Sequence, residues 1–279
     1  MAYRSILVHA SASPGSPNRY RFAARIALAE QAHLAGIAMT GATAFIARYA
    51  MVPAMVPLAP DDVSFLTEHA ENQLAAFEDA VRDIGVAHPS TLLDNGDAAT
   101  ALPWAARYCD LLVIGQAEIP DTVFPDGQAL ARIVLVHAPC PVLVVPEQEA
   151  APGSVPTRPL LAWDGSMEAS RAVRAALPLL RCATGTVVAT FHPAKNLPEG
   201  DAAGQALAAY LACHGIATDL LPARATHDVG QALLSLAATH GCDLIVMGAF
   251  GHSRVREIVL GGATHTILTR TKLPVLMAH

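Results

Sequence analysis

Glycines that could bring the backbone close to a ligand are concentrated near the C-terminus, in the segments Gly248-Ala-Phe-Gly251 and Gly261-Gly262. Glycine tolerates positive φ and lets the backbone approach a ligand closely. A helix that starts at Gly262 would also direct its first main-chain amides toward an anion. A phosphate group is therefore the expected ligand of these segments, and tight turns without a ligand are the structural alternative.

Short apolar runs alternate with helical patterns around these glycines, which predicts that strands and helices hold them in place. Continuous apolar strands are typical of a parallel sheet covered on both faces, and such sheets bind ligands at the carboxyl ends of their strands. Ser166 and Asp228 are suited to cap helices, and for Asp228, which follows His227, capping is favoured over metal binding. The predicted strands are 160–163, 186–191, 217–221, 243–247 and 274–278, and the predicted helices are 166–180, 202–214, 228–240 and 262–271.

Two segments of the first half recur in the second half at one offset. The run Cys109–Gly115 (CDLLVIG) recurs as Cys242–Gly248 (CDLIVMG), 133 residues later. Pro141–Val145 recurs as Pro274–Ala278 at the same offset. Two matches at one offset indicate a duplicated unit, since chance would rarely supply both.

The N-terminal segments of the two copies are less similar in sequence. Ser5–His9 resembles Pro159–Trp163 at a larger offset, so the extra residues of the first copy are expected in its Met- and Pro-rich stretch 43–60. The Pro-, Ala- and Gly-rich stretch 147–159 is typical of a linker. We therefore predict an α/β fold of two tandem, doubly wound, parallel five-stranded sheets.

The glycine spacing of the second copy resembles a known family. Gly248-x-x-Gly251, nine residues, then Gly261 followed by a small residue resembles the nucleotide-binding signature of the universal stress protein family. The resemblance covers both copies and implies a tandem member with a Rossmann- or flavodoxin-like fold of the adenine-nucleotide alpha hydrolase type. Its expected domains are 1–147, degenerate, and 158–279, which carries the motif.

The resemblance implies that the second copy binds an adenine nucleotide, most simply ATP, with ADP or AMP as alternatives and Mg²⁺ beside a triphosphate. Asp164 would hold the adenosine end, and Phe191 would pack on adenine. His252 and Arg254 would approach the phosphates as cations, or else be solvated loop residues. The implied nucleotide-binding residues are Ala162, Trp163, Asp164, Phe191, Met247, Gly248, Gly251, His252, Arg254, Gly261, Gly262, Ala263 and Thr264.

The sequence departs from the family pattern in two places. Gly262 stands where the family usually has Ser or Thr, so one hydroxyl is lost, and Thr264 is a candidate to replace it. In the first copy, the fixed offset maps the motif glycines onto other residues, and His9-Ala10-Ser11 replaces the segment that holds the strand-end acid. We therefore expect no nucleotide in the first copy and a structural or partner role for it. The positions that correspond to Gly248, Gly251, Gly261 and Gly262 are Gly115, Glu118, Gln128 and Ala129.

Composition excludes several classes of protein. Of 279 residues, 53% are hydrophobic and 15% charged, which excludes a disordered chain. The long apolar stretch 36–60 is interrupted by Arg48 and prolines, and no run approaches the roughly 20 residues of a membrane span. No signal peptide is evident. The five scattered cysteines are typical of reduced thiols, and a net charge of −6 disfavours nucleic acid as a partner. A cytoplasmic location is expected.

The sequence disfavours two enzyme functions, a P-loop ATPase and a serine hydrolase, and leaves one rival hypothesis. The chain lacks the G-K-[ST] of a P-loop ATPase. Ser253 lies in a segment that resembles the G-x-S-x-G motif around the nucleophile of α/β hydrolases, but Val255 replaces the last Gly of this motif. We therefore predict a stress-response sensor or regulator rather than an enzyme, with slow ATP hydrolysis at most. The rival hypothesis is a stress-response interaction module that binds no nucleotide.

The terminal strands of the two copies predict how the copies associate. An unpaired edge strand favours pairing with another strand. Pro141–Val145 and Pro274–Ala278 could therefore pair within one chain about a pseudo-twofold axis. A homodimer is also compatible with the sequence.

Overall fold

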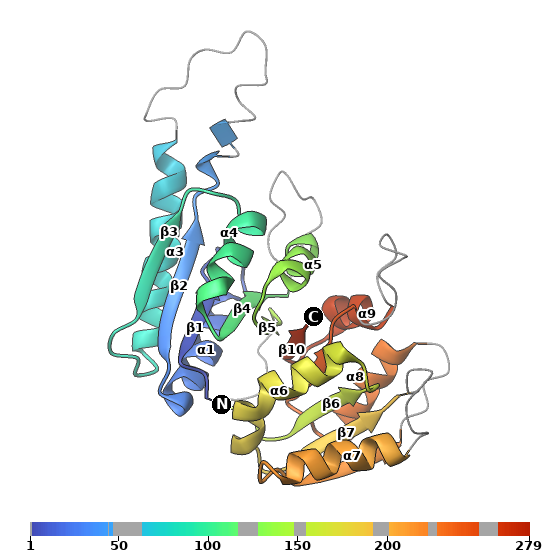
Figure 1. Cartoon of the computed structure of the whole chain (residues 1–279). Coiled ribbons are helices and arrows are strands. Elements are labelled where there is room, and N and C mark those ends of the chain that lie inside the picture. The colour runs from blue at the N-terminus through green and yellow to red at the C-terminus, as the bar shows by residue number, and fades with distance from the viewer. Residues whose placement is uncertain are drawn as a thin grey trace.

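In the part of the chain that the structure describes, ten strands form one continuous sheet in the order β3-β2-β1-β4-β5-β10-β9-β6-β7-β8 (Figure 1). Neighbouring strands are parallel throughout, except for the antiparallel pair of β5 and β10 at the centre. The structure is a computed structural model, which describes residues 2–43, 45–46, 63–116, 128–147, 155–191, 201–222, 228–250 and 262–279.

Each half of the chain contributes five strands. The first half comprises β1 (Ser5–His9), α1 (Ser16–Glu30), β2 (His33–Met39), α3 (Ser64–Arg82), β3 (Ser90–Asp94), α4 (Ala98–Ala105), the 3-10 helix η2 (Ala106–Tyr108), β4 (Leu111–Gly115), α5 (Gln128–His137) and β5 (Val142–Val145). The second half comprises β6 (Pro159–Trp163), α6 (Met167–Cys182), β7 (Thr186–Thr190), α7 (Asp201–Ala212), β8 (Thr218–Pro222), α8 (Val229–Thr239), β9 (Leu244–Gly248), α9 (Gly262–Arg270) and β10 (Val275–Ala278).

The predicted fold class is confirmed, with the two five-stranded sheets joined into one. Each predicted strand and helix of the second half is present, with ends that differ by one or two residues. Ser166 caps α6 by accepting the Ala169 amide at 3.1 Å, and Asp228 caps α8 by accepting the Gln231 amide at 3.0 Å. Apart from residues 43, 45 and 46, the stretch 43–60 lies outside the described residues. Within the described part, no helix is long and apolar enough to cross a membrane.

Helices cover both faces of the sheet, so the strands are buried on both sides. One core cluster packs α1, α3, α6 and α7 against alternate strand residues such as Val8 and Leu161. The other packs α4, α5, α8 and α9 against their neighbours, such as Leu7 and Leu160. This three-layer arrangement explains why the strands are continuous apolar runs.

The joint between the halves is made by backbone and side chains. In the β5–β10 pair, Val275 lies opposite Val144, and both termini of the chain lie near this joint (Figure 1). The Tyr3 hydroxyl donates to the Ala175 carbonyl of α6 at 2.7 Å. On the other face, Gln116 donates through Nε2 to the Leu268 carbonyl of α9 at 2.9 Å. The predicted pairing of the copies within one chain is thus present.

The structure corrects the predicted alignment of the first strands by one residue. Asp110 accepts the amides of Arg4 and Ser5, whereas Asp243, 133 residues later, accepts those of Thr157 and Arg158. Ser5 therefore corresponds to Arg158 and not to Pro159.

This one-residue shift changes which residue of the first half corresponds to Asp164, the acid that follows β6. Val8 and Leu161 now fall on the same face, as the alternation of side chains in a strand requires. An apolar run of four or five residues fits either register by composition, and only the hydrogen bonds distinguish them. Ser11, and not Ala10, corresponds to Asp164, so the inference that the first copy lacks the acid stands.

Candidate functional site

Several of the predicted residues meet at the carboxyl ends of three neighbouring strands, β9, β6 and β7. Trp163 ends β6, and its carbonyl accepts the Phe191 amide at 2.9 Å. On its other side β6 pairs with β9, with Leu161 opposite Val246. Asp164 therefore follows the central strand of the three, where the chain order of the sheet reverses, which is the usual ligand position in open α/β sheets.

A tight turn holds the Asp164 carboxylate at this edge. Its Oδ1 accepts the Ser166 amide at 2.9 Å, and Gly165 between them has φ of +73°. This side-chain turn leads directly into the cap of α6. The carboxylate is partly exposed, and its position is fixed by the backbone rather than by a flexible loop.

The sheet divides the predicted residues between its two faces. Phe191 and Met247 are 7% and 5% exposed and belong to the core under α8 and α9, against which Ala162 packs. Trp163 packs on the opposite face, in the core under α6 and α7. Its Nε1 is buried and has no hydrogen-bond partner among the described residues. Phe191 and Met247 can therefore line one side of a ligand, whereas Trp163 cannot join them there.

Gly248 has a structural role that neither interpretation of the sequence anticipated. A Cβ at this position would lie 2.6 Å from the Ala169 amide nitrogen and 2.7 Å from the Glu168 carbonyl carbon. The N-terminal turn of α6 therefore packs directly on the backbone of β9. No pattern in the sequence signals this contact, because it joins residues about 80 positions apart.

The N-terminus of α9 faces the same edge. The helix begins at Gly262, where a Cβ would meet no atom of the described residues within 4 Å. Ala263 is partly buried, and Thr264 is only 3% exposed. The predicted residues Gly251, His252, Arg254 and Gly261 lie outside the described residues, as do Glu118 and the side chains of Gln128 and Ala129.

The corresponding edge of the first half is occupied by a buried arginine that the sequence analysis did not single out. Arg19 is 1% exposed, and its Nη2 donates to Ser11 Oγ at 2.7 Å and to Ser16 Oγ at 2.9 Å. The Tyr20 hydroxyl donates to the Ser11 carbonyl at 3.1 Å. In the sequence, the closely spaced serines 11, 13 and 16 were the only sign of a polar cluster around Arg19. Where the second half has Asp164, the first half thus has a serine already bound by its own arginine.

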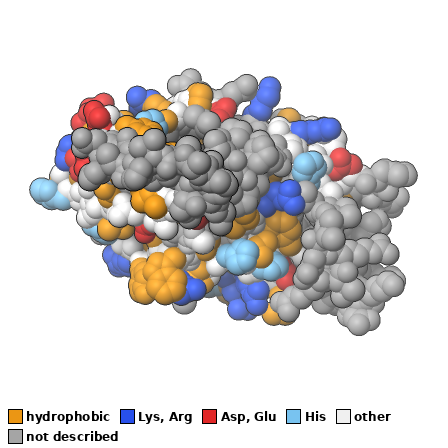
Figure 2. All heavy atoms as spheres, turned by 90° about the horizontal axis from the view of Figure 1, so that it is seen from above, with side chains coloured by type: hydrophobic (Ala, Val, Ile, Leu, Met, Phe, Trp, Pro, Cys, Tyr) orange, Lys and Arg blue, Asp and Glu red, His pale blue; other side chains and the backbone are white. Residues whose placement is uncertain are grey.

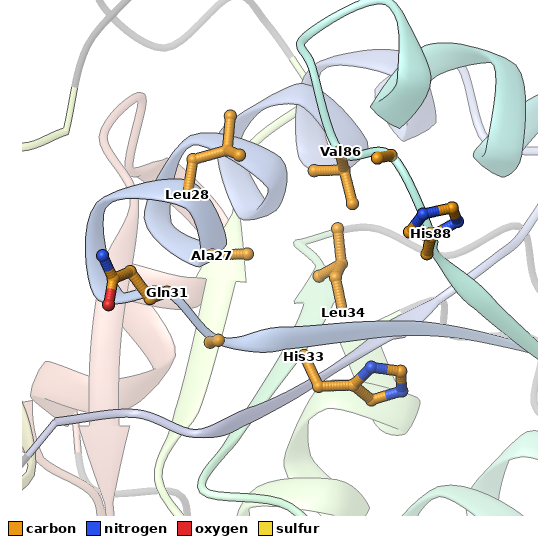
Figure 3. A pocket seen from close by; sticks show the side chains of 9 residues that line it. Ala27, Leu28, Gln31, His33, Leu34, Val86 and His88 are labelled. Atoms are coloured by element: carbon orange, nitrogen blue, oxygen red, sulfur yellow. The ribbon is translucent and has the colours of Figure 1, made fainter.

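A cavity of about 290 Å³ lies away from this edge, at the amino ends of β2 and β3 (Figure 3). Leu34 and Val86 point toward each other across it, and the His33 ring lies on the other side of its strand. The cavity contains none of the predicted residues. In the described part of the chain, no group of three or more His, Cys, Asp or Glu side chains is placed to hold a metal. On the face shown in Figure 2, the basic side chains of the described residues lie among hydrophobic, acidic and His side chains and form no single patch.

The C-terminal half matches a known protein family. Residues 157–279 match the universal stress protein family and therefore form a universal stress protein domain. A universal stress protein of Synechocystis sp. is 24% identical over 219 residues, which cover 75% of this chain and 71% of that protein.

Solved structures support the fold of the whole chain. A universal stress protein from Archaeoglobus fulgidus has a TM-score of 0.73 at 15% identity, and the match covers 98% of this chain and 95% of that one. A functionally unknown protein from Pseudomonas aeruginosa has a TM-score of 0.57 at 18% identity, with 99% and 92% covered. At these identities the similarity establishes the architecture, including both halves.

Proposed function

We propose that this protein binds an adenine nucleotide, ATP before ADP or AMP, at the carboxyl edge of its C-terminal half and acts as a stress-response sensor or regulator rather than as an enzyme. The observation that carries the proposal is the fixed carboxylate of Asp164 between β9 and β7, at the point where the strand order reverses. Residues 158–279 would be the nucleotide-binding domain and residues 1–147 a degenerate copy.

The residues present fit such a ligand in three respects. A carboxylate at the end of β6 is suited to accept hydrogen bonds from ribose hydroxyls. The apolar side chains of Phe191 and Met247 offer one wall for a base. The exposed N-terminus of α9 at Gly262 favours a phosphate through its main-chain amides. Mg²⁺, if it accompanies a triphosphate, would neutralise phosphate charge.

The first half lacks a carboxylate at the position that corresponds to Asp164. Ser11 stands where Asp164 does, and Arg19 already donates to its hydroxyl. A ribose would find no carboxylate there. We therefore expect one nucleotide per chain, and a structural or partner role for the first half. We also propose a cytoplasmic location, where thiols are kept reduced.

Isothermal titration calorimetry with ATP, with and without Mg²⁺, tests the proposal in Asp164→Asn. Asparagine can still accept the Ser166 amide, so the turn survives while the charge is lost. We expect the affinity to fall at least about tenfold, or about 1.4 kcal/mol. The matched control is Ser11→Ala, at the corresponding position of the first half, which should leave affinity and a stoichiometry of one unchanged. Equal affinity in Asp164→Asn and the parent would contradict the proposed site.

One observation favours the alternative, a module that binds no nucleotide. The hydroxyl that the family signature usually carries after Gly261 is absent, and Thr264 is buried. Mass spectrometry of small molecules released from the denatured purified protein distinguishes the two functions. Release of no nucleotide, together with no heat of binding on addition of ATP, ADP or AMP, would favour the interaction module.

A further inference from the structure

Two cysteines of the first half lie in contact at the amino ends of β4 and β5. Because β5 runs antiparallel to β10, this is the same edge of the continuous sheet as the candidate nucleotide site. The Sγ atoms of Cys109 and Cys140 are 3.7 Å apart. Each thiol stands two residues before a strand, Cys109 before β4 and Cys140 before β5. Both side chains are partly exposed, so a small solute can reach them.

The second half shows that the fold does not require this pair. At the offset of 133 residues, Cys109 corresponds to Cys242 and Cys140 to Leu273. Cys242 is buried, and its pKa is raised to about 11, mainly by burial. The same architecture therefore accommodates a single, protected thiol at this place, and the contact between two thiols is particular to the first half.

The contact makes the two sulfurs chemically unequal. Either thiol can donate the hydrogen bond between the two sulfurs, and donation from Cys109 lowers the pKa of Cys140 and raises that of Cys109. Cys109 Sγ also lies 3.7 Å from the Ala106 carbonyl oxygen, which can accept its proton. Because the thiolate is the nucleophile in thiol chemistry, Cys140 is the better attacking group and Cys109 the better resolving group.

From this geometry we propose that Cys109 and Cys140 form a reversible disulfide when the protein meets a hydroperoxide. The Cys140 thiolate attacks the peroxide oxygen, the O–O bond breaks, and the alkoxide or hydroxide released takes up a proton. Cys140 then carries a sulfenic acid. The Cys109 sulfur attacks the Cys140 sulfur, and its proton leaves with the hydroxyl group as water. The two thiols lose two electrons in total, and a dithiol reductant restores them.

The bond would connect two neighbouring strands beside the joint of the molecule. β5 pairs with β4 on one side and with β10 of the second half on the other. A disulfide requires the sulfurs to approach to about 2.05 Å, and both lie in segments that precede the strands rather than within them. The approach can therefore take place without breaking the ladder between β4 and β5.

Peptide mapping of the full-length protein tests the proposal. The reduced protein is treated with one equivalent of hydrogen peroxide, denatured in iodoacetamide and digested with trypsin. Cleavage after Arg107, Arg132 and Arg171 places the two thiols in separate peptides, 108–132 and 133–171, because Pro159 blocks cleavage after Arg158. We expect these peptides to be joined, with the loss of two hydrogens, and separated again by dithiothreitol.

Variants assign the roles and control for other thiols. In Cys109→Ser, dimedone should label Cys140, because its sulfenic acid has no resolving partner. In Cys140→Ser, Cys109 should remain open to iodoacetamide. The double variant Cys182→Ser/Cys213→Ser, which removes the two exposed cysteines, should form the bond as readily as the parent. Cys242, on the peptide 225–254, should stay reduced in every digest.

Three results would overturn the proposal. The first is full alkylation of both thiols after peroxide treatment. The second is oxidation of Cys140 to the sulfinic acid without a linked peptide. The third is a dimedone adduct on Cys109 of Cys140→Ser, with none on Cys140 of Cys109→Ser, which would reverse the assigned roles. Far-UV circular dichroism of each variant establishes that the comparison is made on folded protein.

Discussion

At the scale of single residues, glycines of the same sequence motif have different physical roles. Gly248 is required because the backbone of α6 lies within 2.7 Å of the place where its Cβ would be. Gly262 has open space at the corresponding position. One glycine thus serves packing, and the other is compatible with a ligand above the N-terminus of α9.

This difference predicts a larger loss of stability when alanine replaces Gly248 than when it replaces Gly262. Gly248→Ala should lower the free energy of unfolding by about 1–3 kcal/mol, because an added methyl group overpacks the contact with α6. Gly262→Ala should change it by less than about 1 kcal/mol, since nothing is displaced. Urea denaturation followed by circular dichroism measures both. A Gly248→Ala protein as stable as Gly262→Ala would show that the contact is not close.

At the scale of elements, α8 and α9 are held together near their N-termini. Asp228 caps α8 and also accepts a hydrogen bond from the Thr266 hydroxyl of α9 at 3.4 Å. At Gly230, a Cβ would lie 2.6 Å from Thr266 Cβ, so the two helices approach closely. The position of the α9 N-terminus, which the nucleotide proposal requires, therefore depends on α8.

Substitution of Asp228, the N-cap of α8, tests how much this cap contributes to stability. Asp228→Ala should lower the free energy of unfolding by about 1 kcal/mol, because the Gln231 amide loses its acceptor. Asp228→Asn keeps a side-chain oxygen and should lie within a few tenths of a kcal/mol of the parent. Chemical denaturation of the three proteins measures the difference. The capping role would be refuted by an asparagine variant as unstable as the alanine variant.

At the scale of the whole molecule, the two halves form one structural unit through the joint at β5 and β10. Tyr3 contributes from the first half, because its hydroxyl donates to the Ala175 carbonyl of α6 while the ring is 4% exposed. Burial, with smaller contributions from Glu30 and Asp110, raises the pKa of Tyr3 above its ordinary value. The hydroxyl therefore stays protonated and donating in the folded protein at pH values where an exposed tyrosine ionises.

The raised pKa has a defined consequence for stability. Below the ordinary tyrosine pKa of about 10, both folded and unfolded states keep the proton, and the contribution of Tyr3 is fully present. As the pH rises above about 10, the unfolded state alone loses the proton, so stability falls. Tyr3→Phe should cost about 1 kcal/mol at neutral pH, through the lost hydrogen bond. Its free energy of unfolding should also fall less steeply above pH 10 than that of the parent, when both are measured by urea titration.

The sequence predicted most of the local structure, and the place of the nucleotide site stays a prediction. Continuous apolar runs separated by helical patterns specify strands buried on both faces, and the side chains of Ser166 and Asp228 specify where two helices begin. The acid after β6 and the glycines after β9 indicated a ligand at the carboxyl edge. These are properties of neighbouring residues, so they can be read along the chain.

Other features depended on contacts between residues far apart in the sequence. The register that equates Ser11 with Asp164 appeared only in the amides bound by Asp110 and Asp243. The burial of Arg19 against two serines, the approach of α6 to Gly248 and the contact of Cys109 with Cys140 likewise join separate segments. Apolar strand residues are interchangeable by composition, so sequence alone determined which elements form, whereas packing in three dimensions decided how the elements are aligned and which side chains meet.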